Sequence, residues 1–207
     1  MVIEKLATSL GRRDEVPNQE LAKDIVKQNN KAAVKELIEI LNHKKKDLQS
    51  DSIKVLYEIG ELNPELISDY CNEIGKFLKS KNNRLVWGAM TALDSITRVN
   101  PEGIIKLLPD IIKAADEGSV ITKDHGVSIL AQLCAIKNGY TATAFPLLME
   151  QLKKCPPKQL PMYSEKSMVA VNLDNKEQFL ELLENRFPEL EKDSQRKRVE
   201  KVMKKVK

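Results

Sequence analysis

The sequence predicts an all-α fold, a right-handed α-α superhelix of about five stacked antiparallel helix pairs. Two observations predict it: apolar residues recur at helical spacing, and the same pattern returns after 37 residues. The composition is a third, because aromatic residues are only 4% of the chain while Leu, Ile, Ala, Glu and Lys are common. At 207 residues the chain is long enough for one such domain or two small ones.

The repeat is clearest at two corners, "ELNPELI" at residues 61–67 and "RVNPEGI" at residues 98–104. A residue before proline is pushed out of the helical region, so one helix ends there, and proline suits the first turn of the next. We expect Asn63 and Asn100 to cap the second helix of each pair through their side-chain oxygens. In the third copy Asn138-Gly139 stands at this place and is also a turn signal.

The copies agree at positions that should form the core. In the first helix of each pair Leu56, Leu93 and Leu130 align, as do Ile59, Ile96 and Leu133, and the small residues Ser52, Ala89 and Gly126. In the second helix Ile67 matches Ile104, Cys71 matches Leu108 and Phe145, and Ile74 matches Ile111 and Leu148. The spacing i, i+3, i+4 and i+7 within each copy predicts one buried stripe per helix.

The expected helices follow from this pattern and cover most of the chain. They are residues 18–28, 32–43, 47–61, 64–79, 83–98, 101–116, 120–137, 140–154, 164–171, 175–186 and 192–205. We expect residues 1–191 to form a single helical-repeat domain, with regular repeats at 18–155 and an irregular cap at 156–191. Residues 192–207 then form a basic C-terminal helix or tail.

One stretch resembles the HEAT repeat, a helix pair whose usual period is about 40–47 residues. In "KSKNNRLVWGAMTALDSI", residues 79–96, the family's apolar and small positions hold Leu85, Ala89, Ala92 and Leu93. The chain departs where the family commonly has an arginine, and carries Gln49, Val86 and Lys123 there. The resemblance covers roughly residues 18–155 and extends to other armadillo-like arrays. It implies a HEAT/armadillo-like solenoid that serves as a scaffold or binding surface, and no particular chemistry.

In such solenoids the second helices line the concave face, so the resemblance also implies where a partner binds. The outward positions of these helices should stack as ladders, and the partner-binding residues we predict are Asp69, Glu73, Lys76, Lys106, Asp110 and Lys113. With Glu150 included, the charges of this face sum to −1, which suits a protein or peptide better than a phosphate backbone. A merely solvated face is the alternative interpretation.

The loops between pairs are more basic and suggest a different function, nucleic-acid binding. Its candidate residues lie along one edge and are Lys44, Lys45, Lys81 and Arg84. Asp116 and Glu117 interrupt this edge, and aromatic residues interleaved for base stacking are absent. The HEAT-like DNA glycosylases that excise alkylated bases use aromatic and acidic residues, and here only Trp87 and Asp94 share a similar helix face.

The net charge of +4 is concentrated at the C-terminus, because residues 192–207 carry +6 and the other 191 residues sum to −2. This tail places Val199, Val202, Met203 and Val206 at helical spacing. We expect it to cap the last repeat; docking on a partner, an anionic membrane or nucleic acid is the alternative. Its apolar stripe is too thin for membrane insertion.

The sequence indicates neither an enzyme nor a cofactor. There are two histidines, His43 and His125, too few for a His-rich metal site, and no C-x-x-C pair, Gly-rich phosphate cradle or nucleophile elbow. The three cysteines are widely spaced among apolar residues, which is typical of reduced core thiols. No apolar run is long enough for a signal peptide or a membrane span, so we expect a cytoplasmic, non-catalytic protein.

Overall fold

A computed structural model describes residues 1–136 and 139–206, and every regular element within these ranges is a helix. The chain divides into two compact units, unit 1 (Met1–Gly126) and unit 2 (Val127–Lys207), with the boundary inside helix α8 (Val120–Ala135). The all-α class is therefore confirmed for the described residues. The single domain over residues 1–191 stays a prediction.

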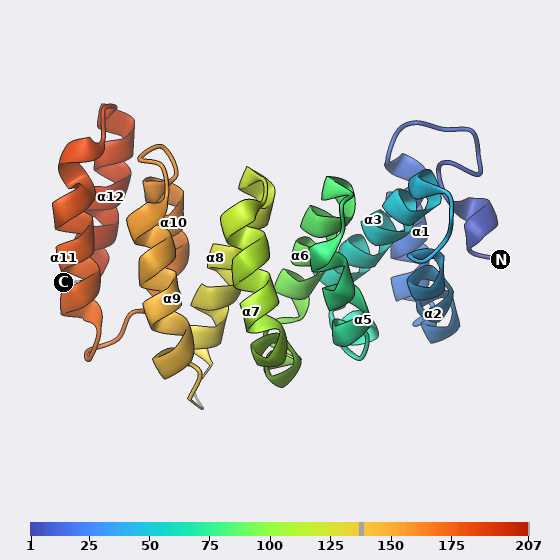
Figure 1. The fold of residues 1–207 in the computed structure, drawn as a ribbon, viewed down its shortest axis with the longest axis horizontal. Helices are drawn as coiled ribbons and strands as arrows, with labels where there is room; N and C mark the ends of the chain where they lie inside the picture. Colours follow the sequence, from blue (N-terminus) through green and yellow to red (C-terminus); the bar gives the residue numbers. More distant parts are fainter. Residues whose placement is uncertain (137–138, 207) are drawn as a thin grey trace. The chain divides into compact units, whose positions relative to one another are not determined.

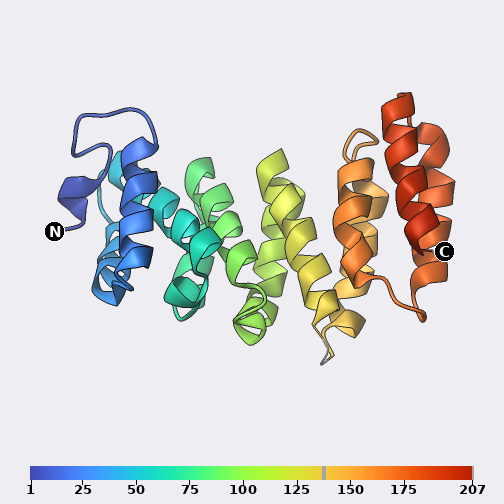
Figure 2. The same ribbon diagram turned by 180° about the vertical axis from the view of Figure 1, so that it is seen from behind.

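Unit 1 alternates first and second helices of successive pairs (Figures 1 and 2). Its elements are η1 (Ile3–Lys5), α1 (Val16–Lys27), α2 (Lys31–Ile40), α3 (Lys46–Leu62), α4 (Glu65–Ser68), α5 (Cys71–Gly75), η2 (Lys76–Lys79), α6 (Asn83–Ile96) and α7 (Pro101–Glu117), followed by the start of α8. Among the first helices, α3 packs against both α1 and α6. Among the second, α5 and η2 pack against α7 and also against α6.

Unit 2 contains the remainder of α8 and the C-terminal elements. These are α9 (Thr141–Lys154), α10 (Leu160–Ser167), η3 (Met168–Ala170), α11 (Lys176–Arg186), η4 (Phe187–Glu189) and α12 (Asp193–Val206). Helix α12 packs against α10 and α11, with Val199 and Val202 buried. The basic C-terminal segment is thus a helix that docks its valines on its neighbours while its lysines face solvent.

The predicted core positions are buried in every copy. Leu56, Leu93 and Leu130 are each 0% exposed, and the same holds for Ile59, Ile96 and Leu133. The second helices bury their aligned residues as well, which are Ile67, Cys71, Ile74, Ile104, Leu108, Ile111, Phe145 and Leu148. The 37-residue alignment therefore identified positions that are structurally equivalent in burial.

Small residues at the repeat positions let helices approach closely. A Cβ atom added to Gly126 would lie 2.8 Å from the Cβ of Ala115. At the equivalent place in an earlier pair, the Ser52 hydroxyl donates a hydrogen bond to the carbonyl oxygen of Leu37 at 2.6 Å. A larger residue at either position would push neighbouring helices apart.

The predicted helix at residues 64–79 is instead divided into α4, α5 and η2. The division falls at Asp69 and Tyr70, where the Ser68 carbonyl oxygen accepts a hydrogen bond at 2.9 Å from the side-chain amide of Asn100. A long-range partner thus replaces the bond that a continuous helix would supply. The helix predicted at residues 164–171 begins earlier, at Leu160, because Pro161 suits its first turn.

The two predicted asparagine caps have different outcomes. The Asn100 side-chain oxygen accepts a hydrogen bond from the Gly103 backbone N–H at 3.0 Å and caps α7, as predicted. Asn63 is instead the C-terminal flanking residue of α3, and α4 has no side-chain cap, so that prediction was wrong. The turn predicted at Asn138-Gly139 falls partly outside the described residues, because the structure does not describe Asn138.

Cys71, Cys134 and Cys155 are free thiols and all three are buried, as expected for core cysteines. Burial raises the pKa of Cys71 and of Cys134 to about 11, and it also raises the pKa of Cys155. None of the described helices is both long enough and apolar enough to cross a membrane.

Candidate functional site

The residues predicted to contact a partner lie on the second helices of unit 1. Glu73 is on α5, Lys76 on η2, Asp69 follows α4, and Lys106, Asp110 and Lys113 are on α7. All six are exposed or partly exposed, and α5, η2 and α7 are packed neighbours. We call these six residues the second-helix face. Its described ion pair joins the Asp110 carboxylate to the ammonium of Lys79 at 2.8 Å.

A second polar surface, which the sequence did not suggest, covers the first helices of unit 1. Its residues are Glu15, Asp51, Lys54, Tyr57, Glu58, Glu61, Arg84, Trp87, Asp94 and His125, which we call the first-helix face. At its centre the Lys54 ammonium lies 2.9 Å from the carboxylate of Glu15 and 2.6 Å from that of Glu58. The Lys54 side chain is only 10% exposed, so its charge is satisfied almost wholly by protein groups.

Aromatic rings complete the surroundings of this lysine. Its ammonium lies 4.7 Å from the centre of the Tyr57 ring, within the range of a cation–π interaction. The Tyr57 and Trp87 rings are 5.7 Å apart and tilted by 51°, so α3 and α6 share an aromatic contact. Burial alone would lower the pKa of Lys54, but its hydrogen bonds to Glu58, Tyr57 and Glu15 outweigh burial and raise it.

The first-helix face continues toward α8 through acidic groups. The Asp94 carboxylate lies 2.7 Å from Nδ1 of His125. Glu61 is exposed, yet its pKa is raised by partial burial and by the neighbouring carboxylates of Glu58 and Asp94. This face carries five carboxylates, those of Glu15, Asp51, Glu58, Glu61 and Asp94, and two cations, Lys54 and Arg84. Its formal charge is therefore −3 when His125 is not counted.

At its N-terminal end the first-helix face adjoins a polar hollow of about 420 Å³. The loop before α1 forms one wall and is fixed by Asp51, whose carboxylate accepts hydrogen bonds from the Thr8 backbone at 2.7 Å and the Asn18 amide at 2.9 Å. Arg84 crosses from α6 to Glu15 at 3.1 Å. The side chains that line the hollow are therefore already joined by hydrogen bonds and an ion pair.

The basic edge predicted as the nucleic-acid alternative is only partly assembled. Lys44 and Lys45 precede α3, while Lys81 and Arg84 line a shared hollow together with the acidic residue Asp47. Arg84 is engaged by Glu15. Trp87 and Asp94, the two residues compared with those of the DNA glycosylases, make other contacts. Trp87 is partly buried against Tyr57, and Asp94 contacts His125. Trp87 aligns with Ser50 and Asp124 in the other copies, and these polar positions predict an exposed ring, whereas the structure leaves it only partly exposed.

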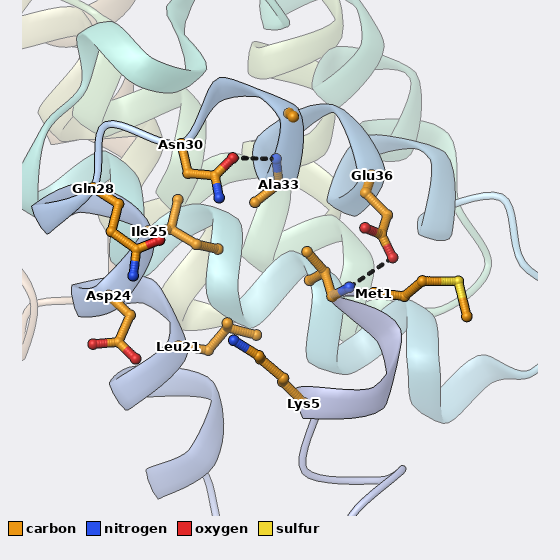
Figure 3. A pocket seen from close by; sticks show the side chains of 11 residues that line it. Met1, Lys5, Leu21, Asp24, Ile25, Gln28, Asn30, Ala33 and Glu36 are labelled. Carbon is orange, nitrogen blue, oxygen red and sulfur yellow. Dashed lines mark hydrogen bonds between the residues drawn. The ribbon is translucent and has the colours of Figure 1, made fainter.

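Another hollow, near the N-terminus, lies between η1, α1 and α2 (Figure 3). Glu36 accepts a hydrogen bond from the Val2 backbone at 2.7 Å and so fastens the first residues over the end of unit 1. Lys5, Asp24 and Gln28 are on its rim, while Leu21 and Ile25 form the apolar wall. No group of three or more metal-binding side chains occurs among the described residues.

Comparison with known proteins identifies the fold and no family. No protein-family model matches the chain, and no curated protein matches its sequence. A designed armadillo repeat protein in complex with the peptide (KR)4 is similar in structure, with a TM-score of 0.71 at 14% identity over 91% of this chain and 87% of that chain. Kap121p bound to RanGTP has a TM-score of 0.64 at 12% identity, over 97% of this chain and 23% of that one.

An archaeal HEAT-like repeats protein from Thermococcus onnurineus NA1 has a TM-score of 0.50 at 11% identity, over 94% of this chain and 97% of that chain. Identities this low establish likeness of fold and nothing more. The predicted HEAT/armadillo-like resemblance is therefore confirmed at the level of fold: the chain has the fold of an armadillo- or HEAT-type helical-repeat protein.

Proposed function

We propose that this protein is a cytoplasmic, non-catalytic helical-repeat scaffold that binds a protein or peptide partner on unit 1. The observation that carries the proposal is the row of linked acidic and aromatic side chains on α3 and α6, which a core does not require. Two of the structurally similar proteins support it, since one is bound to a peptide and another to RanGTP. The buried free thiols support a reducing compartment.

The charge of the first-helix face favours a basic partner. Its formal charge of −3, and the nearby carboxylates of Glu58 and Asp94 that raise the pKa of Glu61, give a negative surface whose charge a lysine or arginine of a partner would compensate. Trp87 adds a partly exposed ring against which a guanidinium can stack. Lys54 and Arg84 hold the carboxylates of Glu15 and Glu58 in place, so these two side chains would lose little entropy on binding.

The second-helix face is a second candidate for the same function. Its residues are exposed on elements that pack together, so an extended partner could contact Asp69, Glu73 and Lys76 and continue to Lys106, Asp110 and Lys113 on α7. Its mixed charge favours a partner of mixed charge rather than a uniformly basic one.

A binding titration separates the two faces. The probe is fluorescein-labelled (KR)4 peptide, measured by anisotropy at low and moderate salt, with a (DE)4 peptide as the charge control. We expect Glu61→Lys to weaken binding of the basic peptide about tenfold, and binding to weaken as salt rises. Glu65→Lys on α4 is the matched control, because it makes the same charge change outside both faces.

Other results of these titrations would favour the second-helix face or nucleic-acid binding. Weakening by Asp69→Lys and Glu73→Lys, with no effect of Glu61→Lys, would place the peptide on the second-helix face. Binding of a labelled DNA duplex that is lost on Lys44→Glu and Lys81→Glu would favour the nucleic-acid alternative. Equal binding of (KR)4 by the wild type, by Glu61→Lys and by Asp69→Lys with Glu73→Lys would contradict the proposal of a basic-peptide site on unit 1.

A further inference from the structure

A rigid loop in unit 2 holds a leucine out in solvent. Leu173 lies between η3 and α11 and is 84% exposed, the highest fraction among the exposed large apolar side chains of the described residues. An isolated exposed leucine is ordinary on a protein surface. This one is unusual because the loop that carries it is fixed by hydrogen bonds.

Two asparagines form the hydrogen bonds. The Asn172 side-chain oxygen accepts from the backbone N–H groups of Asp174 at 2.9 Å and Asn175 at 3.2 Å. In return the Asn175 side-chain oxygen accepts from the backbone of Asn172 at 2.8 Å, and its amide donates to the carbonyl oxygen of Ala170 at 3.0 Å. The Asn175 side chain is buried and its bond to Ala170 lies inside the protein, while the bond to the Asp174 N–H is exposed. Together the four bonds fix where Leu173 is presented.

A hollow of about 310 Å³ lies beside this leucine, between the loop and the C-terminal end of α12. Its apolar lining comes from Met168, Val171, Leu173 and Val206, and its cations are Lys176 and Lys205. No acidic residue is among the described residues that line it. Lys201 and Lys204 on α12 are exposed and add positive charge nearby, while Asp174, Glu177 and Glu165 are the neighbouring acidic residues outside the lining.

We propose that this hollow is a docking site for a short acidic segment of another protein. An apolar side chain of the segment enters the hollow beside Leu173, and flanking carboxylates meet Lys176 and Lys205. The complementary charge and the absence of a carboxylate in the lining argue for an acidic partner. The fixed loop lowers the entropic cost of binding, as expected for an interface anchor.

The concave form of the site favours a peptide over an anionic membrane. A bilayer needs a broad protruding apolar surface, whereas here the apolar groups other than Leu173 line a hollow. The site is in unit 2 and selects acidic ligands, while the proposed partner of unit 1 is basic. The two proposals can therefore fail independently.

The test starts from a display library of random twelve-residue peptides, selected on the whole protein. The expected result is enrichment of peptides that place Leu, Phe or Ile beside Asp or Glu. The best enriched peptide is then labelled and titrated. Leu173→Ser should weaken it about tenfold or more, and Lys176→Glu with Lys205→Glu should weaken it as much. Leu173 and both lysines are at the surface, and circular dichroism checks that each variant folds.

Matched controls make the assignment specific. Leu62→Ser removes another exposed leucine, and Lys192→Glu with Lys197→Glu makes the same charge change outside the hollow, so both should bind like the wild type. Absence of any enriched acidic peptide, or equal binding of the enriched acidic peptide by Leu173→Ser and the wild type, would overturn the proposal. Leu173-dependent binding to phosphatidylserine vesicles without any enriched acidic peptide would overturn it in favour of a membrane.

Discussion

Asn100 joins two helix pairs: its amide donates to the Ser68 carbonyl oxygen at 2.9 Å while its side-chain oxygen caps α7 through the Gly103 N–H. One side chain thus satisfies backbone groups on two neighbouring second-helix elements. We expect Asn100→Ala to lower the free energy of unfolding by about 1–3 kcal/mol, because both backbone groups lose a partner.

Urea unfolding followed by circular dichroism measures this effect. Asn63→Ala is the control, since Asn63 precedes a helix without a side-chain cap, and it should change the free energy by no more than about 0.5 kcal/mol. Asn100→Asp keeps the cap and loses the donor, so its stability should fall between the two. Equal effects of the Asn63 and Asn100 variants would contradict the assigned roles.

Glu61 provides a pH-dependent prediction. Its pKa is raised in the folded protein, first by burial and then by the neighbouring Glu58 carboxylate, so its ionised form destabilises the fold. The contribution of Glu61 to the free energy of unfolding therefore increases as the pH is lowered. The increase begins near its raised pKa in the folded protein and is complete below the ordinary value of 4.5. Glu61→Gln should stabilise the protein at pH 7 by less than about 1 kcal/mol, because solvent screens the partly exposed group.

The advantage of Glu61→Gln over the wild type should shrink at pH 4, where the wild-type carboxyl is protonated in both states. Urea midpoints of the two proteins at pH 4 and pH 7 measure it. A stability gain of Glu61→Gln that is larger at pH 4 than at pH 7 would contradict the prediction that ionised Glu61 destabilises the fold.

The cysteines should be unreactive in the native protein. Burial raises the pKa of Cys71 and Cys134 to about 11, so the thiolate that reacts with disulfide reagents is scarce at pH 8. We expect slow reaction with Ellman's reagent in buffer and rapid reaction of all three thiols in concentrated urea. Fast native reaction of even one thiol would show that its helix opens readily.

Gly88 should tolerate no larger side chain. A Cβ atom added to Gly88 on α6 would lie 2.7 Å from Cγ1 of Ile53 on α3. Gly88→Ala should therefore lower the free energy of unfolding by about 1–3 kcal/mol despite the better helix propensity of alanine. Ile53→Ala removes both γ carbons that the new Cβ would meet, so the double variant should lose less stability than the sum of the two single changes. A strictly additive double variant would contradict this contact.

The sequence was sufficient for the core and insufficient for the surfaces. Positions such as Leu56 and Leu93 are set by local periodicity, so the repeat identified them directly. The break after Ser68 depends on Asn100, which is 32 residues away, and no local pattern encodes that bond.

The first-helix face was missed for a similar reason. Lys54 and Glu58 are one helical turn apart and visible in the sequence, but Glu15, which directly precedes α1, joins them only in the folded chain. A lysine between the core residues Ile53 and Val55 was the available signal. The residues of the second-helix face lie on or beside elements that pack together, and their role in binding stays a prediction.

The chain repeats one helix pair, so the aligned leucines should contribute equally to the core of each copy. The most direct measurement is the free energy of unfolding of Leu56→Ala, Leu93→Ala and Leu130→Ala, with the exposed Leu62→Ala as the reference. We predict losses of about 2–5 kcal/mol for each of the three and almost none for the reference. A loss below about 1 kcal/mol at one aligned leucine would contradict the account.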